Sequence, residues 1–295
     1  MKVLVTGGTG FIGPKVVHAL RAAGHDIRCL VRRPERADYL VSLNCELAQG
    51  DMTDAASLRR AAEGVDAVVH LVAIIVGRPR DFERIMEGGT RDLVAAAREA
   101  GARRFVLMSA LGTGEATKDL TPYYRAKWEM EQAAEASGLD YVIFRPSFVF
   151  GRDGGVLPMF ARQVRWSPVT PIVGDGNRRL QPIWVEDVAA YFERGVSAPE
   201  AVNRTFELGG PDVVTWNELY DRIRRVLRKR RLTVHVPTGL VRAGALVAER
   251  LPRPPVTRDQ LTMLVHADNV VSSNDAVETF RLPLVPLDEQ IRKIA

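Results

Sequence analysis

Short apolar runs alternate, over the first 150 residues, with longer segments in which apolar positions recur at helical spacing. The short runs predict strands near residues 2–6, 26–31, 45–49, 67–71, 104–108 and 140–145. The periodic segments predict helices near residues 12–23, 54–63, 83–101 and 122–138. Apolar strands that alternate with amphipathic helices are typical of a parallel sheet covered by helices on both faces. We therefore predict a doubly wound α/β fold, in which ligands bind at the carboxyl ends of the strands.

The pattern becomes less regular after residue 150, where glycines and prolines mark a series of turns. We predict a dinucleotide-binding domain over 1–150 and a smaller substrate or partner lobe over 151–295. A segment at 180–200 is predicted to return to the first domain, because an apolar run there leads into a helical pattern.

The first predicted strand runs directly into a glycine-rich turn, Thr6-Gly7-Gly8-Thr9-Gly10-Phe11-Ile12-Gly13, which is followed by a predicted helix. In this order, backbone N–H groups and the positive end of the helix dipole face an anion, and glycines allow a diphosphate to approach the main chain. The alternative is an ordinary turn that uses glycine for its positive φ. The strand before the turn and the helix after it favour the phosphate-binding interpretation.

Two arginines, Arg32 and Arg33, follow the second predicted strand, where an NAD-preferring site would carry a carboxylate for the ribose hydroxyls. A guanidinium instead binds a 2′-phosphate, so the pair favours NADP(H) over NAD(H). After the third strand, Asp51 is predicted to accept a hydrogen bond from the adenine and Met52 to pack on its ring. The alternative is that Asp51 caps the next helix through Thr53 and Asp54.

Tyr123 and Lys127 lie four residues apart on the helix predicted after the fifth strand, and so on one face of it. A lysine ammonium there can favour the tyrosine phenolate and also hydrogen-bond a nicotinamide ribose. We therefore predict that Tyr123 transfers a proton beside hydride transfer, with a purely structural pair as the alternative.

Composition excludes several other classes of protein. Cys29 and Cys45 do not form a disulfide framework or a CxxC pair, and we expect both to be small apolar side chains buried in the core. The five histidines are scattered without ligand spacing, so no metal site is predicted. No apolar stretch is long enough to cross a bilayer, and the chain opens on a strand rather than a signal peptide, so we expect a soluble cytoplasmic protein.

The net charge is +5, and the densest basic run lies in a predicted amphipathic helix over 219–231. A second amphipathic helix is predicted over 239–251, ended by the proline-rich stretch 251–255. The ordinary interpretation of the basic face is a solvated surface, and contact with anionic lipid, an acidic protein or nucleic acid is the alternative. Because no nucleic-acid-binding motif accompanies it, no nucleic acid is predicted as a partner.

Taken together, these motifs resemble the short-chain dehydrogenase/reductase superfamily over nearly the whole chain. The segments that carry the resemblance are 6–13, 50–51, 70–73, 108–110, 123–127, 145–151 and 184–189. Their order is similar to that of the extended and atypical members, the NAD-dependent epimerase/dehydratase group, and most closely to bacterial relatives of the 39 kDa accessory subunit of respiratory complex I.

The resemblance implies that the glycine turn lines the diphosphate site, that residues 71–73 flank the adenosine and ribose, and that residues 146–148 approach the nicotinamide. Tyr123 and Lys127 match the family's catalytic pair, and Ser109 ends the fifth strand as the family's first serine does. The predicted cofactor-binding residues are Gly7, Thr9, Gly10, Phe11, Ile12, Gly13, Arg32, Arg33, Asp51, Met52, Leu71, Val72, Ala73, Lys127, Pro146 and Phe148.

The chain departs from the family at Leu111, where catalytic members usually carry a Ser or Thr whose hydroxyl orients the substrate oxygen. Ser109 and Thr113 are the candidates to replace it. The main hypothesis is an NADP(H)-dependent oxidoreductase acting on a small carbonyl, alcohol or quinone-like substrate. The alternatives are a non-catalytic NADP(H)-bound accessory protein of a respiratory or quinone system, with peripheral membrane or protein contact through 219–251, and a nucleotide-sugar epimerase or dehydratase.

Overall fold

The computed structural model describes residues 1–248 and 257–295, so the predicted helix end at 251–255 lies outside the described residues. The chain divides into two compact units. Unit 1 comprises Met1–Pro146, Val185–Leu208 and Ser273–Pro283, and unit 2 comprises Ser147–Trp184, Gly209–Ser272 and Leu284–Ala295. The chain therefore returns to unit 1 twice, whereas the sequence pattern indicated one return, near 180–200.

Unit 1 is built on a seven-stranded sheet in which every neighbouring pair is parallel. The strands are β1 (Lys2–Thr6), β2 (Asp26–Val31), β3 (Glu46–Gln49), β4 (Ala67–His70), β5 (Arg104–Met108), β6 (Asp140–Pro146) and β11 (Arg204–Leu208). Their order is β11-β6-β5-β4-β1-β2-β3, so the direction of winding reverses between β1 and β4. The predicted doubly wound fold is confirmed, and the carboxyl ends of β1 and β4 form its switch point.

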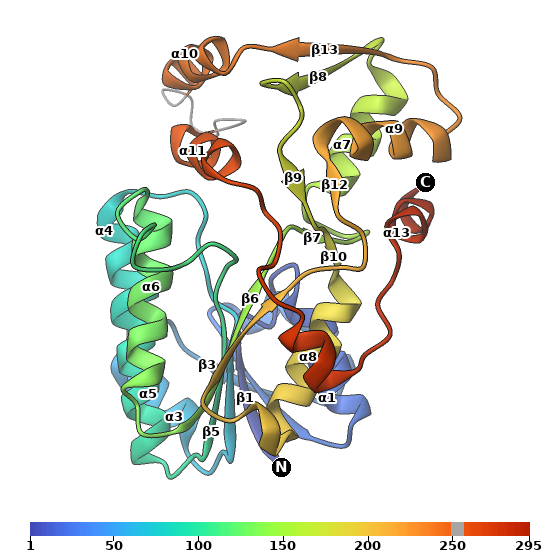
Figure 1. The fold of residues 1–295 in the computed structure, drawn as a ribbon. Helices are drawn as coiled ribbons and strands as arrows, with labels where there is room; N and C mark the ends of the chain where they lie inside the picture. Colours follow the sequence, from blue (N-terminus) through green and yellow to red (C-terminus); the bar gives the residue numbers. More distant parts are fainter. Residues whose placement is uncertain (249–256) are drawn as a thin grey trace. The chain divides into compact units, whose positions relative to one another are not determined.

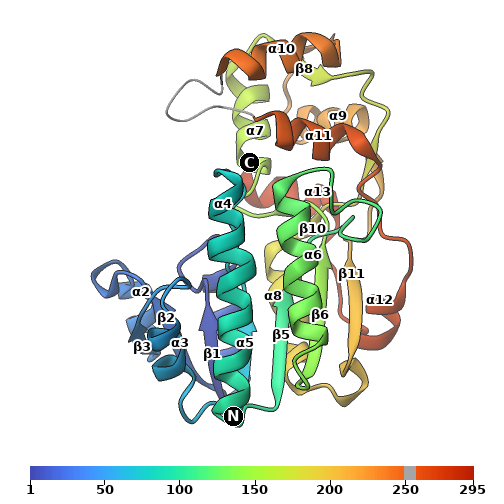
Figure 2. The same ribbon diagram turned by 90° about the vertical axis from the view of Figure 1, so that its left-hand side faces the viewer.

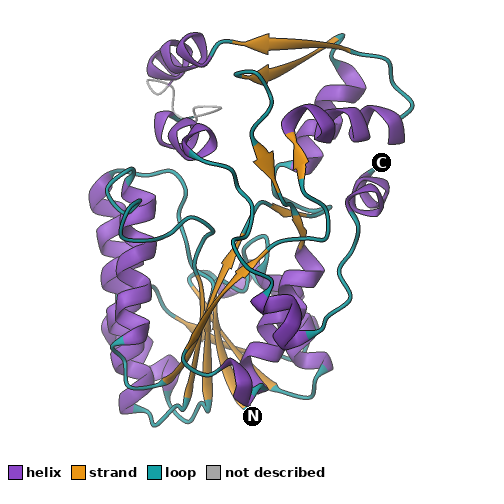
Figure 3. Ribbon diagram, viewed as in Figure 1, coloured by secondary structure: helices purple, strands orange, loops and turns teal. Residues whose placement is uncertain are grey.

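Helices cover both faces of this sheet (Figures 1 and 3). One face carries α3 (Ala55–Ala62), α5 (Gly89–Glu99) and α6 (Pro122–Glu135), with α4 (Pro79–Phe82) leading into α5 through a wider turn over Glu83–Gly88. Figure 2 shows α5 and α6 side by side in front of the strands. The other face carries α1 (Gly13–Ala22), α8 (Val185–Ser197) and α12 (Asp275–Phe280), and the short α2 (Asp38–Ser42) precedes β3.

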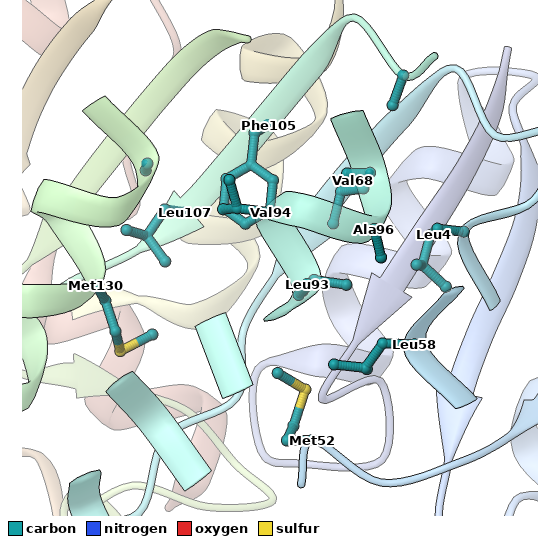
Figure 4. Close-up of a cluster of buried hydrophobic side chains, with 14 of the residues drawn as sticks. Leu4, Met52, Leu58, Val68, Leu93, Val94, Ala96, Phe105, Leu107 and Met130 are labelled. Atoms are coloured by element: carbon teal, nitrogen blue, oxygen red, sulfur yellow. The ribbon is translucent and has the colours of Figure 1, made fainter. Parts of the chain in front are cut away.

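The core of unit 1 lies between the sheet and the first of these helix layers (Figure 4). Leu4 and Phe105 of the strands pack with Leu58, Leu93 and Met130 of α3, α5 and α6, and all five are fully buried. Burial of each such side chain contributes about 2 kcal/mol. The two cysteines are free and buried, as predicted. This packing holds the strands in fixed positions, and a site at their carboxyl ends needs such rigid support to keep its geometry.

The described part of unit 2 contains three two-stranded sheets, β7–β10, β9–β12 and β8–β13. The strands are β7 (Val149–Phe150), β8 (Val169–Val173), β9 (Arg179–Leu180), β10 (Ile183–Trp184), β12 (Val214–Thr215) and β13 (Leu232–Val236). The helices are α7 (Leu157–Trp166), α9 (Trp216–Val226), α10 (Thr238–Ala248), α11 (Arg258–His266) and α13 (Leu287–Ile294). Leu157, Leu219 and Ile291 of α7, α9 and α13 meet in its apolar core.

The predicted helix over 219–231 is partly wrong. Helix α9 begins earlier, at Trp216, where Thr215 and Glu218 form a capping box, and it ends at Val226. Arg228 then takes a left-handed φ of 52°, which a helix interior does not allow. Residues 227–231 therefore form a turn that leads into β13. No helix within 1–248 and 257–295 combines the length and the apolar character that a membrane span requires.

Candidate functional site

The turn between β1 and α1 can be formed only with glycine at two of its positions. Gly7 has a φ of 80°, and a Cβ there would lie 3.1 Å from the backbone of Leu71 and Val72. A Cβ on Gly13 would lie 2.2 Å from the carbonyl oxygen of Gly7, well inside contact distance. Gly10 closes the turn by donating its N–H to the same carbonyl at 3.0 Å. The main chain is therefore drawn close to the ends of β1 and β4, as a phosphate-binding turn requires.

The amino end of α1 is open to an anion. Ile12 is the N-cap residue, no side chain among the described residues caps this end, and Pro14 occupies the first turn. Thr9 and Gly10 are exposed, and Phe11 and Ile12 are half-buried. Because the first N–H groups of a helix need external acceptors and carry the positive end of its dipole, a diphosphate fits these residues.

Beyond β2, the structure places Arg32 and Arg33 on the surface, immediately before a short 3-10 turn over Pro34–Arg36. Beyond β3, the positive charge of Arg32 acts to lower the pKa of Asp51. Burial by itself raises the pKa of Asp51, but hydrogen bonds from Thr53 and the charges of Arg32 and Arg84 outweigh it, so the pKa lies below its ordinary value. This carboxylate is ionised at neutral pH and can accept a hydrogen bond.

The alternative in which Asp51 caps helix α3 is wrong. Its Oδ1 accepts from the N–H and hydroxyl of Thr53, at 2.9 and 2.8 Å, which closes a local turn. The N-cap of α3 is Asp54, whose carboxylate accepts from the N–H groups of Ala56 and Ser57. Met52 is 5% exposed and packs in the core of unit 1 (Figure 4), so little of its side chain remains for an adenine ring.

Leu71, Val72 and Ala73 leave β4 alongside the glycine turn. The N–H of Leu71 donates to the carbonyl of Thr6 at 3.1 Å, which continues the pairing of β4 with β1. Leu71 is buried, and Val72 and Ala73 are half-buried. These residues therefore line the switch point that the fold uses for ligands.

Tyr123 and Lys127 lie in the first turns of α6, which Thr121 caps by accepting from the N–H of Tyr124. The Nζ atom of Lys127 lies 5.9 Å from the centre of the Tyr123 ring and donates to the carbonyl of Met108 at 2.6 Å. Since Met108 is the last residue of β5, this bond holds the ammonium beside Ser109. The structure thus brings the predicted catalytic residues of α6 to the carboxyl end of β5.

Burial shifts the pKa values of both side chains toward their neutral forms. It raises the pKa of Tyr123, with a smaller contribution from Tyr124. It lowers the pKa of Lys127 to about 7, although the charge of Glu131 opposes the shift. The phenol of Tyr123 therefore keeps its proton at neutral pH, and Lys127 titrates near neutrality.

Glu131 lies one turn beyond Lys127 and was not predicted as a site residue. Its fully buried carboxylate accepts from Nε and Nη2 of Arg145, on β6, at 2.8 and 2.6 Å. This bidentate pair fixes the carboxylate one turn from Lys127, where its charge raises the pKa of the lysine. The four-residue spacing of positions 123, 127 and 131 places Glu131 on the same face of α6 and could have indicated it. The spacing could not show that Arg145 of β6 pairs with Glu131.

The hydroxyl of Ser109 lies 3.4 Å from that of Thr113, and both residues are buried. Leu111, between them, is 6% exposed, and its N–H donates to the carbonyl of Pro146 at 3.0 Å. The position that usually carries a hydroxyl in the family is therefore filled by an apolar side chain, and a pair of hydroxyls flanks it.

A buried hydrogen-bond network beneath the switch point was also not predicted from the sequence. His70 Nδ1 lies 2.6 Å from the hydroxyl of Thr6, and its Nε2 lies 3.0 Å from the hydroxyl of Thr90. Burial lowers the pKa of His70 to about 3, and the charge of Lys127 contributes to the shift. The ring is neutral at physiological pH and joins the ends of β1 and β4 to α5.

The two remaining predicted residues belong to different units. Pro146 ends β6 in unit 1, whereas Phe148 lies in unit 2, where its N–H donates to Asn269 at 3.1 Å and its ring packs edge-on against Trp216. Their contact with a nicotinamide stays a prediction.

Two family models match this chain. The model described as NAD(P)H-binding covers residues 7–158, and the model of the RmlD substrate binding domain covers residues 108–264. The first spans the glycine turn and the strand ends described above.

Three known proteins illustrate the similarity. The ceramide reductase of Caulobacter vibrioides is 34% identical over 250 residues, which span 83% of this chain and 77% of that protein. The mitochondrial NADH dehydrogenase (ubiquinone) 1 alpha subcomplex subunit 9 of Arabidopsis thaliana is 28% identical, over 96% of this chain and 73% of that protein. The NADPH-dependent quinone oxidoreductase of Escherichia coli, complexed with NADPH, has the same fold, with a TM-score of 0.79 over 98% of both chains at 20% identity.

Proposed function

The chain belongs to the extended short-chain dehydrogenases/reductases, a family that binds NAD(P)H, and on this premise we propose that it is an NADP(H)-dependent oxidoreductase. Its substrate is a small carbonyl, alcohol or quinone-like compound. The observation that carries the proposal is the position of Lys127, whose buried ammonium joins Tyr123 of α6 to the end of β5 beside Ser109. The names of two relatives, a ceramide reductase and a quinone oxidoreductase, support a reductase over other activities of the family.

The cofactor is held by backbone and by charge. The turn from Gly7 to Gly13 and the open end of α1 hold the diphosphate, and Arg32 and Arg33 hold the 2′-phosphate. Asp51 accepts from the adenine, and residues 71–73 flank the adenosine. When bound, the nicotinamide supplies or accepts the hydride.

Side chains of α6 and of the segment that follows β5 transfer the proton and orient the substrate. Because burial keeps the phenol of Tyr123 protonated, it serves as the general acid when a carbonyl is reduced. Lys127 in its charged form stabilises the phenolate that remains and hydrogen-bonds the nicotinamide ribose. The hydroxyl pair of Ser109 and Thr113 replaces the missing hydroxyl at Leu111 and orients the substrate oxygen.

A second candidate is a non-catalytic protein that holds NADP(H) as a structural ligand in a respiratory or quinone-related assembly. The buried Leu111 favours it, because a catalytic member would usually place a hydroxyl there. The same residue counts against a nucleotide-sugar epimerase or dehydratase.

The proposal places the protein in the cytoplasm, with peripheral membrane contact through 219–251.

Replacement of Tyr123 by Phe tests the oxidoreductase. We expect NADPH-dependent turnover to fall by about a hundredfold or more, because the general acid is lost, while NADPH affinity stays nearly unchanged. Turnover is measured as NADPH oxidation over a series of carbonyls and quinones, and affinity by calorimetry. Tyr124→Phe is the matched control, since it removes the neighbouring phenol. Equal turnover of the wild type and Tyr123→Phe would exclude the mechanism, and NADPH binding without any turnover would favour the second candidate.

A further inference from the structure

Unit 2 carries a cluster of cations in the last turn of α9 and in the chain reversal that follows it, a segment that we call the basic turn (residues 224–231). Its side chains line an open depression of about 700 Å³ with a single acidic residue, and the lining comprises Asp221, Arg224, Arg225, Arg228, Lys229, Arg230 and Arg231. Such an excess of one charge creates a positive potential that attracts an anionic partner.

Two of these arginines hold the turn in shape. Arg224 donates to Thr233 and to the carbonyl of Arg231, and it pairs with Asp221. Arg231 donates to the carbonyls of Val164 and Arg165, at 2.9 Å each, at the end of α7. These bonds fasten the basic turn to α7 and β13.

The other four cations, Arg225, Arg228, Lys229 and Arg230, are exposed. The left-handed φ of Arg228 and the bond from Lys229 N–H to the carbonyl of Arg224, at 3.0 Å, reverse the chain sharply at this point. The reversal gathers Arg228, Lys229 and Arg230 directly after Arg225 of α9, whereas a continuing helix would have spread these charges around its circumference.

An apolar surface adjoins the basic turn. Strand β13 pairs in parallel with β8, with Leu232 opposite Val169 and Val234 opposite Pro171. Leu232 is 73% exposed, and the other three are also exposed, whereas the alternate residues of β8, Thr170 and Ile172, are buried. Because side chains of a strand alternate between faces, these four apolar side chains lie on one face of the ribbon, where Val173 and Val236 at the far end are half-buried.

Two elements next to β8 and β13 in the chain also expose large apolar side chains. Trp166, the last residue of α7, is 75% exposed and follows the carbonyl of Arg165 that Arg231 contacts. Helix α10 begins two residues after β13 (Figure 1), and its Leu240 and Leu246 are exposed. Single exposed apolar residues are ordinary, but a tryptophan and an aliphatic face beside four exposed cations are not.

We propose that this amphipathic surface, the basic turn with Trp166 and the exposed face of β8–β13, binds an anionic lipid bilayer. The arginines and the lysine contact headgroup phosphates, while Trp166 and the aliphatic side chains enter the boundary between headgroups and acyl chains. A nucleic acid would use the cations but leave Leu232 and Val234 in water, and a merely solvated face would account for the cations but not for the exposed apolar side chains beside them. This inference deepens the membrane contact of the proposed function and does not depend on turnover.

Co-sedimentation of the full chain with vesicles tests the charge. We expect it to bind vesicles of phosphatidylcholine with phosphatidylserine, not to bind phosphatidylcholine alone, and to be released by high salt. The variant Arg228→Glu/Lys229→Glu/Arg230→Glu should bind at least about tenfold more weakly. The control Arg59→Glu/Arg60→Glu/Arg98→Glu changes the net charge equally on exposed residues of unit 1 and should bind as the wild type does. Equal binding of the two variants, or no binding of the wild type, would overturn the proposal.

Tryptophan fluorescence tests the apolar part. We expect the emission to shift to shorter wavelength on addition of anionic vesicles, and the shift to be lost in Trp166→Phe. A shift that persists in this variant, or binding to single-stranded DNA or polyglutamate but not to vesicles, would also overturn it. NADPH oxidation by the same variants should equal that of the wild type. Membrane binding without turnover would then contradict the proposed activity alone, and turnover without membrane binding would contradict this inference alone.

Discussion

At the scale of single residues, burial sets the acid–base state of the candidate site. Tyr123 and Lys127 both move toward their neutral forms, because a low-dielectric surrounding disfavours either charge. With the pKa of Lys127 lowered to about 7, its protonated fraction changes steeply across the physiological range. A side chain that usually stays charged is thus poised to respond to pH and to ligands.

Also at the residue scale, Arg32 and Arg33 should decide between the two nicotinamide cofactors. Replacement of both by Ala should weaken NADPH binding by about tenfold or more, because charge-assisted hydrogen bonds to the 2′-phosphate are lost. NADH binding should change little. Calorimetry with each cofactor measures the difference, and Arg36→Ala, an exposed arginine three residues further on, is the control. Equal losses for NADPH and NADH would remove the arginines from cofactor selection.

At the scale of elements, α6 and β6 together complete the site. Tyr123, Lys127 and Glu131 recur every four residues along α6, and Arg145 of β6 pairs with the last of them at 2.6 Å. The pair keeps a negative charge near Lys127 and so counters part of the desolvation that favours the neutral amine. Glu131 is therefore a positioning residue for the charge of Lys127.

Replacement of Glu131 by Gln should shift the pH profile to lower pH. The charged form of Lys127 is present below its pKa, about 7, and is lost as the pH rises through it. Without the opposing charge of Glu131 the pKa of Lys127 falls further, so activity that needs the ammonium is lost at lower pH. If that pKa fell by about one, turnover at a pH above the midpoint would fall about tenfold.

The measurement for this variant is the pH dependence of kcat, with Glu135→Gln, an exposed carboxylate one turn further along α6, as the control. His70 also feels the charge of Lys127, but it is neutral throughout the range because its pKa lies at about 3. A parallel fall in activity at every pH would indicate a merely structural role for Glu131.

At the scale of the whole molecule, the two units are interleaved along the chain. Segments 185–208 and 273–283 return to unit 1, where β11 pairs with β6 and Phe280 packs on Phe144 and Phe206. Unit 1 is therefore assembled from three separate stretches of sequence, and its stability depends on all of them.

Cofactor binding should stabilise the folded protein by mass action. At about a hundredfold excess over the dissociation constant, NADPH contributes roughly 2.7 kcal/mol, which should raise Tm by about 5 °C or more. Differential scanning calorimetry measures the shift. In Gly13→Ala the added Cβ would meet the carbonyl of Gly7 at 2.2 Å, so the turn cannot close and the NADPH-dependent rise should vanish. A full rise in this variant would show that the cofactor binds elsewhere.

Much of the first 150 residues was predictable because its signals are local. The six strands, the glycine turn and the shared face of Tyr123 and Lys127 follow from spacing within a few residues. The end of α9 could not be predicted in this way. Basic and apolar residues keep helical spacing past Val226, although the chain turns at Arg228. The alternative interpretation, in which Asp51 caps α3, was wrong for a similar reason. Asp51 and Asp54 are equally good capping residues by type, so local sequence could not show that Asp54 is the N-cap.

The sequence by itself determined the doubly wound sheet, the family and the glycine-rich turn after β1, since each depends on residues that are neighbours in the chain. The tertiary structure decided which distant groups meet. It paired Glu131 with Arg145, set His70 between Thr6 and Thr90, and joined Lys127 to the carbonyl of Met108. It also left the apolar face of β8–β13 uncovered beside the basic turn. Contacts of this kind arise from strand order and helix packing, which no local periodicity encodes.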